Sequence, residues 1–394
     1  MISVDEALSR LFALCAPLGP ETVPLRRAAG RILAAPVVAR RDQPPFAASA
    51  MDGYAIHAAD DRPGSCIRII GEAAAGLRFS GEVSPGHAVR IFTGAPIPVG
   101  AARVVIQEDV HRDGDNITLG DRLDSGTHMR PAGQDFRAGA QILAPRQLSC
   151  ADLGLIAAMN VAEVSVARRP IVAVIATGNE LGMPGEAPGP DQIIASNSFA
   201  LAALAEAAGA DVRMLPIARD TEASLQFTLG LATGADLIVT SGGASVGDHD
   251  LVAHVTEAMG MERSFYKIAM RPGKPLMAGR LGKSLLLGLP GNPVSSMVCG
   301  HIFMLPLLRA MQGLPAAPAP VKRALLARPV AANGVRAHYM RARVADRDGV
   351  DYLDPFDRQD SALLSVLADA NALLVRPVDD PALPTGAAVS YIPL

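Results

Sequence analysis

The sequence predicts a multidomain fold of the α/β plus β class, with a central parallel α/β domain between β-rich regions. From 170 to 312, apolar runs rich in β-branched residues alternate with helix-like segments, which is typical of βαβ units around a parallel sheet. On either side, short Val and Ile runs are separated by Gly, Pro and Asp, which indicates β-rich structure. At 394 residues the chain is too long for one hydrophobic core, so we expect several domains.

The first expected domain is a helical linker domain built from two separated segments, residues 1–45 and 146–169. Near the N-terminus the sequence SVDE has the spacing of a capping box, and the apolar periodicity that follows predicts a helix over 3–16. A second helix is expected over 153–159, after the similar sequence SCAD. We expect these two helices to pair with each other.

Two β-rich regions complete the expected layout. Residues 46–145 predict an insertion lobe, because their Val and Ile runs are short and closely punctuated by turn residues. The proline-rich segment 314–320 predicts a semi-rigid linker. Residues 321–394 predict a C-terminal domain that resembles a β-barrel, with one helix over about 361–370.

The α/β domain, residues 170–312, contains the most regular pattern of the chain. We expect its strands at 171–176, 211–217, 236–240 and 284–289. We expect its helices at 199–208, 221–232, 250–259 and 293–311.

The composition excludes several classes of function. Basic and acidic residues nearly balance, at 36 and 39, and Trp is absent, so the sequence predicts neither nucleic-acid binding nor membrane-surface binding. Neither a secretory signal nor a run of about 18 apolar residues is recognisable, which favours a soluble, cytoplasmic protein. The cysteines form no CxxC pair and are expected to be free and mostly buried; they are Cys15, Cys66, Cys150 and Cys299.

Three polar loops are expected at the carboxyl ends of the α/β strands, where open α/β sheets bind their ligands. Residues 177–180 follow the first strand, 241–248 follow the third, and 289–295 lead into the last helix. A basic, proline-containing segment, 271–275, precedes the last strand. The loop residues expected to contact a ligand are Gly242, Gly243, Ser245, Pro290, Gly291, Asn292, Pro293 and Ser295.

These loops suit a phosphate or another oxyanion. Glycines let backbone N–H groups approach a ligand closely, and a helix N-terminus offers unpaired N–H groups with a favourable dipole. Arg271 and Lys274 add positive charge, whereas Glu180 and Asp250 are hard oxygen ligands for a magnesium ion. The combination predicts metal-assisted phosphate chemistry.

Each of these motifs also has a simpler interpretation. A single SGG or PGNP segment is more often a tight turn, and a lone carboxylate such as Glu180 is usually solvated. The prediction depends on three such loops meeting at one sheet edge. An ordinary P-loop is excluded, because Met277 occupies the position of the glycine required upstream of Gly282-Lys283-Ser284.

Six motifs occur in the order found in one family. They are SAMDGYA (49–55), TGAP (93–96), TGNE (177–180), SGGASVG (241–247), RPGKP (271–275) and LPGNPVS (289–295). Together they resemble molybdopterin molybdenumtransferase of the bacterial MoeA type, which is similar to the E domain of gephyrin. The resemblance covers essentially the whole chain, and it implies that the α/β domain is similar to MogA.

The resemblance implies a reaction. Adenylylated molybdopterin is bound, molybdate is delivered to its dithiolene sulfurs, the adenylyl pyrophosphate link is cleaved, and AMP leaves with the assistance of Mg²⁺. The protein is then expected to be a homodimer that also contacts molybdopterin adenylyltransferase transiently.

The resemblance also implies roles for individual residues. Asp52 and Thr93 of the insertion lobe are expected to complete the active site of the partner subunit, and Asp135 is a further acid of the site. Glu180, Asp220 and Asp250 correspond to the acids near magnesium and nucleotide. The implied basic cluster is Lys267, Arg271 and Lys274. The residues implied around molybdate are Pro275, Ser295, Arg341 and Ser361.

Three residues depart from the family pattern. Arg271 stands where Lys is common, so a planar fork replaces a point charge. Asn179 stands where Asp is frequent, which removes one possible magnesium ligand, and Asp360 places a negative charge before Ser361.

The sequence leaves two alternative functions open. A molybdopterin adenylyltransferase would share the α/β domain, but such proteins contain little more than that domain. A catalytically inactive scaffold, which the resemblance to gephyrin could suggest, would need a partner-binding patch, and no exposed amphipathic motif is evident in the sequence.

Overall fold

The expected strands of the α/β region form one sheet in the structure, a computed structural model that describes residues 1–243 and 251–394. Its strand order is β18-β15-β19-β23-β22-β20, and neighbouring strands among the first four run parallel. The strands are β15 (Ile171–Ala176), β18 (Asp211–Met214), β19 (Leu237–Ser241), β20 (Glu262–Tyr266), β22 (Met277–Leu281) and β23 (Ser284–Leu289). The parallel α/β prediction is confirmed for β18, β15, β19 and β23, but β22 runs antiparallel to both of its neighbours.

The chain divides into two units, which are described separately. Met1–Glu21 and Ala167–Leu394 form one unit, and Thr22–Val166 forms the other. The first unit contains the α/β domain and the C-terminal domain, whereas the second contains the linker segments and the insertion lobe.

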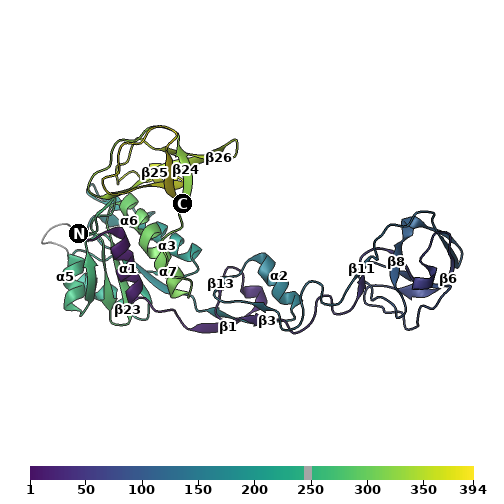
Figure 1. Ribbon diagram of the computed structural model, residues 1–394. Coiled ribbons are helices and arrows are strands. Elements are labelled where there is room, and N and C mark those ends of the chain that lie inside the picture. The colour runs from purple at the N-terminus through teal and green to yellow at the C-terminus, as the bar shows by residue number, and fades with distance from the viewer. Residues whose placement is uncertain (244–250) are drawn as a thin grey trace. The chain divides into compact units, whose positions relative to one another are not determined.

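Each face of the α/β sheet has its own core. Because successive strand residues point to opposite faces, Val172 and Val174 of β15 enter one core while Ala173 and Ile175 enter the other. The first face is covered by α1, α3, α6 and α7, and the second by α4 and α5 (Figure 1). Their bounds are α1 (Val4–Leu14), α3 (Asn197–Ala207), α4 (Glu222–Leu231), α5 (Leu251–Ala258), α6 (Pro293–Cys299) and α7 (Leu305–Met311).

Helices α6 and α7 are joined by a π-helical turn, η4 (Gly300–Met304), into one continuous helix. The segment Pro293–Met311 is long and apolar enough to cross a membrane by length and composition, with a mean hydropathy of 1.4. Because 78% of its most apolar window is buried inside the protein, we interpret it as a core helix of the α/β domain.

Helix α1 is the main correction to the predicted layout. Ser3 caps it as expected, accepting a hydrogen bond from Glu6 N (3.1 Å). Its apolar face, including Leu8 and Leu11, packs against β20, β22 and α7 in the core of the α/β domain. The predicted pairing of this helix with the helix at 153–159 is therefore wrong. Periodicity shows which face of a helix is buried but not against which element.

The second unit contains the expected helix after the SCAD sequence, α2 (Cys150–Ala158). Ser149 and Asp152 form a complete capping box, with Asp152 Oδ2 accepting hydrogen bonds from Ser149 N (2.8 Å) and Ser149 Oγ (2.7 Å). Helix α2 packs beside a small sheet of order β1-β14-β2-β13 and a strand pair, β12-β3. The elements are β1 (Pro20–Pro24), η1 (Leu25–Arg27), β2 (Ile32–Leu33), β3 (Val37–Val38), β12 (Gln141–Ile142), β13 (Arg146–Gln147) and β14 (Glu163–Ala167).

The insertion lobe is β-rich, as expected. Its main sheet has the order β8-β5-β7-β6-β10-β9, and a separate pair joins β11 to β4. Tyr54 and Ile56 enter one core of the lobe, and Ala55 between them enters a second. The elements are β4 (Ala48–Ser49), β5 (Gly53–Ile56), η2 (Ala58–Asp60), β6 (Cys66–Ala73), β7 (His87–Ile91), β8 (Arg103–Ile106), η3 (Gln107–Asp109), β9 (Val110–Asp113), β10 (Asn116–Leu119) and β11 (Met129–Arg130).

The C-terminal domain is a closed barrel, as predicted. Its sheet has the order β21-β25-β26-β24-β28-β27, and an additional pairing of β25 with β27 closes it. Strand β21 (Met270–Arg271) comes from the α/β segment and pairs with the start of β25. The other elements are β24 (Lys322–Leu326), β25 (Ala337–Arg347), β26 (Val350–Pro355), α8 (Leu364–Ala368), β27 (Ala372–Arg376) and β28 (Ala388–Pro393).

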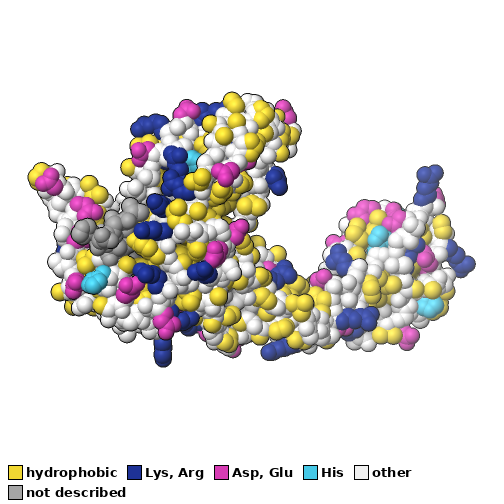
Figure 2. Space-filling model, turned by 60° about the vertical axis from the view of Figure 1, so that its left-hand side comes forward, with side chains coloured by type: hydrophobic (Ala, Val, Ile, Leu, Met, Phe, Trp, Pro, Cys, Tyr) yellow, Lys and Arg dark blue, Asp and Glu magenta, His cyan; other side chains and the backbone are white. Residues whose placement is uncertain are grey.

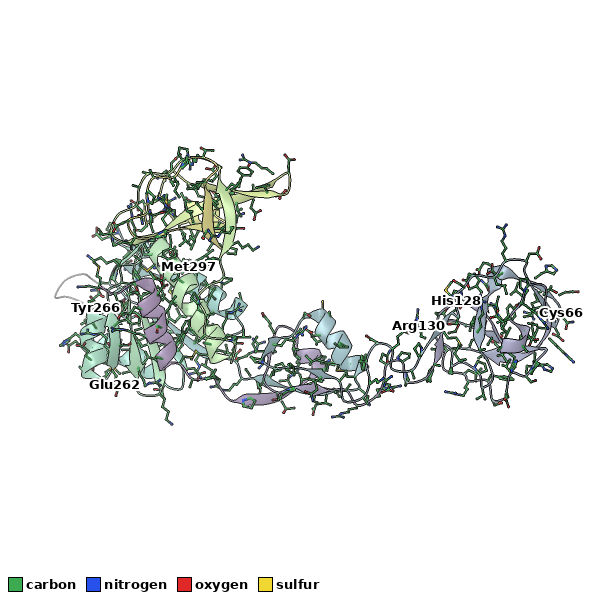
Figure 3. All side chains as sticks on the ribbon, viewed as in Figure 1. Cys66, His128, Arg130, Glu262, Tyr266 and Met297 are labelled. Atoms are coloured by element: carbon green, nitrogen blue, oxygen red, sulfur yellow. The ribbon has the colours of Figure 1, made fainter. Side chains whose placement is uncertain are left out.

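The cysteines are free thiols, as expected, but they are not mostly buried. Cys299 is buried, Cys15 is half-buried, and Cys66 and Cys150 are exposed. Cys66 lies at the start of β6 in the insertion lobe (Figure 3). The expectation is wrong for Cys66, which lies on the exposed face of β6 beside the buried Ile67, and for Cys150, which lies at the exposed start of α2.

Candidate functional site

A cavity of about 1030 Å³ lies at the carboxyl ends of β15, β19 and β23. Parallel strands end at the same sheet edge, so the loops after these strands meet there. The expected site residues that line the cavity are Glu180, Asp220, Gly242, Gly243, Pro275, Pro290, Gly291, Asn292 and Pro293. The cavity thus brings together all three predicted loops.

At the floor of the cavity, Gly242 and Gly243 lie close to Thr177. A Cβ on Gly242 would lie 2.4 Å from Thr177 O, and one on Gly243 would lie 2.8 Å from Thr177 Oγ1. Both glycines also have positive φ, +100° and +65°. Any larger residue at either position would clash or be strained. Thr177 Oγ1 is itself buried and has no hydrogen-bond partner among the described residues.

The loops that follow β15 and β18 form an acidic wall, with Glu180 on the first and Asp220 on the second. Asn179 N donates to Asp220 Oδ2 (3.0 Å), and Asp220 N donates to Asn179 Oδ1 (3.1 Å), so the two loops are locked together. Gly178, with φ +151°, leaves room for Glu180, because a Cβ there would lie 2.4 Å from Glu180 Oε2. The two bonds to Asp220 use only the main-chain N–H and the side-chain oxygen of Asn179, so they do not explain why Asn stands where Asp is frequent in the family.

The described residues contain two of the three expected magnesium ligands. Glu180 and Asp220 both line the cavity. Asp250 and the expected ligand-binding residue Ser245 lie outside the described residues. Within the described ranges, no group of three or more His, Cys, Asp or Glu side chains is placed to hold a metal ion.

Asn197 joins two of the three loops and was missed by the sequence analysis. Its Nδ2 donates to Ser241 Oγ (3.0 Å) at the end of β19 and to Gly291 O (2.7 Å) at the end of β23. Ser241 Oγ in turn lies 3.3 Å from Ser296 Oγ on α6. An asparagine that opens a helix is common, so only the tertiary structure reveals this contact.

One side of the cavity is apolar, and this side was also missed. It is formed by Leu181, Ile193, Ile194 and Leu251, with His254 at its edge. The short strands β16 (Leu181–Gly182) and β17 (Ile193–Ile194) pair with each other and carry three of these residues. The side chain of Ile193 is 60% exposed, and an exposed apolar pair is a signal of a ligand or partner surface.

The start of α6 is held by the C-terminal domain. Asn292 Nδ2 donates to Ser361 Oγ (3.0 Å), and Val294 N donates to Ser361 O (3.1 Å). Ser361 therefore lies beside the predicted anion-binding loop, although it does not line the cavity among the described residues. Ser295 is almost completely buried, with 4% of its surface exposed.

Arg341 is buried in the C-terminal domain, with 1% of its surface exposed. Its guanidinium donates to three main-chain carbonyls, those of Arg358 (3.2 Å), Asp360 (2.9 Å) and Leu363 (3.0 Å). In this arrangement Arg341 shapes the loop that carries Ser361.

The expected basic cluster lies beside the cavity rather than in its wall. Among the described lining residues, the segment contributes Pro275 but not Lys267, Arg271 or Lys274. Lys267 Nζ lies 4.9 Å from the centroid of the Tyr266 ring on β20, at the edge of the sheet (Figure 3). Arg271 is exposed on β21, opposite His338 of β25.

His338 lies among arginines. Burial, followed by the charges of its neighbours, lowers its pKa to about 4. Those neighbours, in order of effect, are Arg271, Arg376, Arg336 and Arg341. Figure 2 shows Lys and Arg side chains gathered over the barrel and the adjoining α/β domain on the face in view. Four arginines therefore surround His338 in this part of the first unit.

Asp52 and Thr93 lie together on the insertion lobe. Asp52 Oδ1 accepts hydrogen bonds from Thr93 N (2.7 Å) and Thr93 Oγ1 (2.8 Å). These two bonds, with a smaller contribution from the charge of Arg90, lower the pKa of Asp52. The next residue must be Gly53, because a Cβ there would lie 1.9 Å from Val105 O.

Asp135 follows β11 and is exposed. Its N–H donates to Gln43 O (2.9 Å), which holds this segment to the residues before β4. Among the described residues, no hydrogen bond joins Asp135 to Asp52 or Thr93.

The fold and the cavity define a class of protein: a multidomain α/β protein whose central domain has a cavity between glycine loops, a helix start and paired acids. The chain belongs to the molybdopterin molybdenumtransferase family. Residues 2–160 match the "MoeA N-terminal region (domain I and II)", 173–310 a "probable molybdopterin binding domain", and 323–394 the "MoeA C-terminal region (domain IV)".

Individual relatives agree with this assignment. The molybdopterin molybdenumtransferase of Nostoc sp. is 34% identical, with 100% of this chain and 94% of the relative covered. Molybdopterin molybdenumtransferase 2 of Mycobacterium tuberculosis H37Rv is 36% identical, with 96% of each chain covered. The crystal structure of the molybdopterin biosynthesis MoeA protein of Pyrococcus horikoshii OT3 is similar with a TM-score of 0.84 and 26% identity, covering 100% of both chains.

Proposed function

We propose that this protein inserts molybdenum into molybdopterin during synthesis of the molybdenum cofactor. In the proposed reaction it binds adenylylated molybdopterin, delivers molybdate to the dithiolene sulfurs, and cleaves the phosphate–phosphate link so that AMP leaves. The observation that carries the proposal is the cavity at the sheet edge, where glycine loops, a helix start and two carboxylates meet in a member of this family. The apolar side of the cavity suits a planar ring system, and the loops suit its phosphates.

The acidic wall suits Mg²⁺. Glu180 and Asp220 supply hard oxygen ligands, and Mg²⁺ commonly uses one or two carboxylates together with substrate phosphates and water. We propose that these two residues and Asp250 hold the ion. A magnesium ion bound there would neutralise negative charge that develops on the phosphate oxygens.

The basic segment and the barrel are proposed to receive molybdate. Lys267, Arg271 and Lys274 are assigned to the dianion by charge, with Pro275, Ser295 and Ser361 beside it. We assign Arg341 a positioning role in this site, because its guanidinium is buried and bonded to carbonyls of the loop that carries Ser361.

We further propose that the protein is a homodimer in which Asp52 and Thr93 serve the partner's active site. The exposed, ionised carboxylate of Asp52 supports a role toward a ligand outside its own lobe. Asp135 is proposed as a further acid of the same shared site. The protein is proposed to work in the cytoplasm and to contact molybdopterin adenylyltransferase transiently, as the source of its substrate.

The two alternatives are less well supported. An adenylyltransferase of the small type would leave the domains matched by residues 2–160 and 323–394 without a role. A scaffold without catalysis would not require a cavity with paired acids and glycine loops.

The proposal is tested by incubating the full-length protein with adenylylated molybdopterin, Mg²⁺ and molybdate. We expect release of AMP and formation of cofactor that activates an apo-enzyme. Glu180→Gln should lower the rate by about 100-fold, because it removes a charged ligand from the acidic wall. AMP release no faster than in a protein-free control would contradict the proposed function.

A further inference from the structure

We propose that Arg90 is a positioning residue for Asp52: its guanidinium fixes the main chain that follows Asp52 and supplies a positive charge near its carboxylate. This inference rests on the proposed function, in which Asp52 takes part in catalysis. Arg90 belongs to none of the motifs that identify the family, and its role is evident only from its contacts.

The guanidinium of Arg90 lies over two aromatic rings. Its Cζ lies 4.9 Å from the centroid of Tyr54 and 4.9 Å from that of Phe92. Tyr54 stands directly opposite Arg90 in the pairing of β5 with β7, and Phe92 is two residues further along the chain. Contact with two rings restricts the guanidinium, and a lysine ammonium lacks the planar group that packs against aromatic rings.

The guanidinium nitrogens of Arg90 also donate hydrogen bonds. Arg90 Nη1 donates to Gly53 O (3.1 Å), and Nη2 donates to Gln107 Oε1 (2.7 Å). Gln107 N in turn donates to Asp52 O (3.2 Å). Gln107 thus binds the carbonyl of Asp52, and Arg90 binds the carbonyl of Gly53. Because Arg90 also donates to Gln107, these four residues form a closed ring of contacts.

This ring leaves the Asp52 carboxylate presented in one orientation. Oδ1 accepts both hydrogen bonds from Thr93, whereas among the described residues no donor reaches Oδ2. Because its backbone carbonyl and Oδ1 are both occupied, Oδ2 is the atom that can meet a ligand. A carboxylate that must act on a ligand is more effective when its position is fixed beforehand.

The charges around Asp52 are asymmetric. Arg90 of β7 faces it and favours its ionised form. On η3, Glu108 accepts a hydrogen bond from Gln107 Nε2 (3.2 Å), so the Gln107 amide links Arg90 to an acidic side chain. Tyr54 of β5 and Thr93 contribute no charge. Removing Arg90 therefore removes the cation and leaves the negative charge of Glu108.

The experiment compares Arg90→Gln, Arg90→Lys, Asp52→Asn and the control Arg68→Gln in the full-length protein. Arg68 is an exposed arginine on β6 of the same sheet, so its replacement removes a charge from the lobe but not from this cluster. The measurements are kcat and KM for AMP release across a pH series, with the thermal midpoint of each variant.

We expect Arg90→Gln to lower kcat about tenfold, with a small change in KM, and to move the acid limb of the kcat profile to higher pH. Arg90→Lys should restore the position of the acid limb but not the full kcat, because charge returns without the planar fork. Arg68→Gln should match the wild type, and Asp52→Asn should be inactive.

Two results would overturn the inference alone: wild-type kcat and pH profile in Arg90→Gln while Asp52→Asn is inactive, or equal losses in both Arg90 variants with an unmoved acid limb. The second pattern would indicate a merely structural role. Full activity of Asp52→Asn would instead contradict the proposed role of Asp52 and the inference with it.

Discussion

Single residues hold the three loops of the cavity in position relative to one another. Asn197 is the clearest case, because one side-chain nitrogen donates to acceptors on two loops, Ser241 Oγ and Gly291 O. Those loops approach so closely that a Cβ on Gly291 would lie 3.4 Å from Gly242 Cα. A residue at position 197 that cannot donate would leave Ser241 Oγ and Gly291 O without this hydrogen bond.

Replacing Asn197 with Asp tests this role with almost no change of volume. The carboxylate cannot donate, so we expect affinity for AMP in the presence of Mg²⁺ to fall about tenfold, as measured by titration calorimetry. The matched control is Asn160→Asp, the same chemical change at an exposed position in the other unit. Unchanged affinity in Asn197→Asp would show that the loops hold their geometry without this amide.

At the scale of elements, two segments hold a neutral histidine inside the first unit. His301 lies on η4, where burial lowers its pKa from 6.5 to about 4. His338 lies on β25, where burial and the neighbouring arginines lower its pKa to about 4 as well. Both elements therefore favour the uncharged imidazole.

This predicts acid-sensitive stability of the first unit. In the unfolded chain both histidines titrate near pH 6.5, so between pH 6.5 and 4 the unfolded state binds more protons than the folded state. The stabilisation is complete above pH 6.5 and is lost as the pH falls toward 4. We expect the thermal midpoint of unfolding to fall by several degrees across this window in scanning calorimetry.

The variant His301→Asn checks the assignment of that pH dependence. It should lower the midpoint at pH 7.5 but make it less dependent on pH between 6.5 and 4.5, because one titrating group is gone. Acids with a lowered pKa, such as Asp152, titrate below their ordinary value of 3.8 and lie outside this window. An unchanged slope would show that His301 does not contribute.

The strands of the α/β sheet show how much of the fold could be predicted from the sequence. Strands β15, β19 and β23 consist mainly of buried apolar residues, so their pattern identifies them and places their loops at one edge. Strand β22 has the sequence MAGRL, which contains no β-branched or aromatic residue, so no pattern marks it. Its position depends on pairing with β23 in three dimensions.

The candidate site could also be predicted only in part from the sequence. Glycine loops and acids are visible as motifs, whereas Asn197 and the Ile193–Ile194 side of the cavity act through tertiary contacts. Arg341 could be chosen by resemblance, but its burial against loop carbonyls is a property of the folded barrel. The local sequence pattern identifies residues of the types that bind ligands. It does not identify the other residues that hold those side chains in place.

At the scale of the whole molecule, the proposed dimer makes a specific prediction. If Asp52 serves the partner's cavity, a mixed dimer of an Asp52→Asn subunit and a Glu180→Gln subunit contains one intact site. Co-expressed, differently tagged subunits should then release AMP at about half the wild-type rate per dimer, although Asp52→Asn alone is expected to be inactive and Glu180→Gln alone about 100-fold slower.

The outcome distinguishes the two arrangements directly. If both residues acted within one subunit, each site of the mixed dimer would lack one of them, and the mixed dimer would be as inactive as the parents. A sample in which both subunits carry both substitutions is the control for residual activity.

The pairing of β21 with β25 also has a consequence for how the two domains of the first unit depend on each other. Met270 and Arg271 leave the α/β segment to join a strand of the barrel through main-chain hydrogen bonds. The guanidinium of Arg271 is thereby carried by the C-terminal domain, although its place in the chain lies between β20 and β22. Shortening or exchanging the barrel would displace the Arg271 guanidinium, although Arg271 belongs by sequence to the α/β domain. The α/β domain and the barrel are therefore expected to change together in evolution.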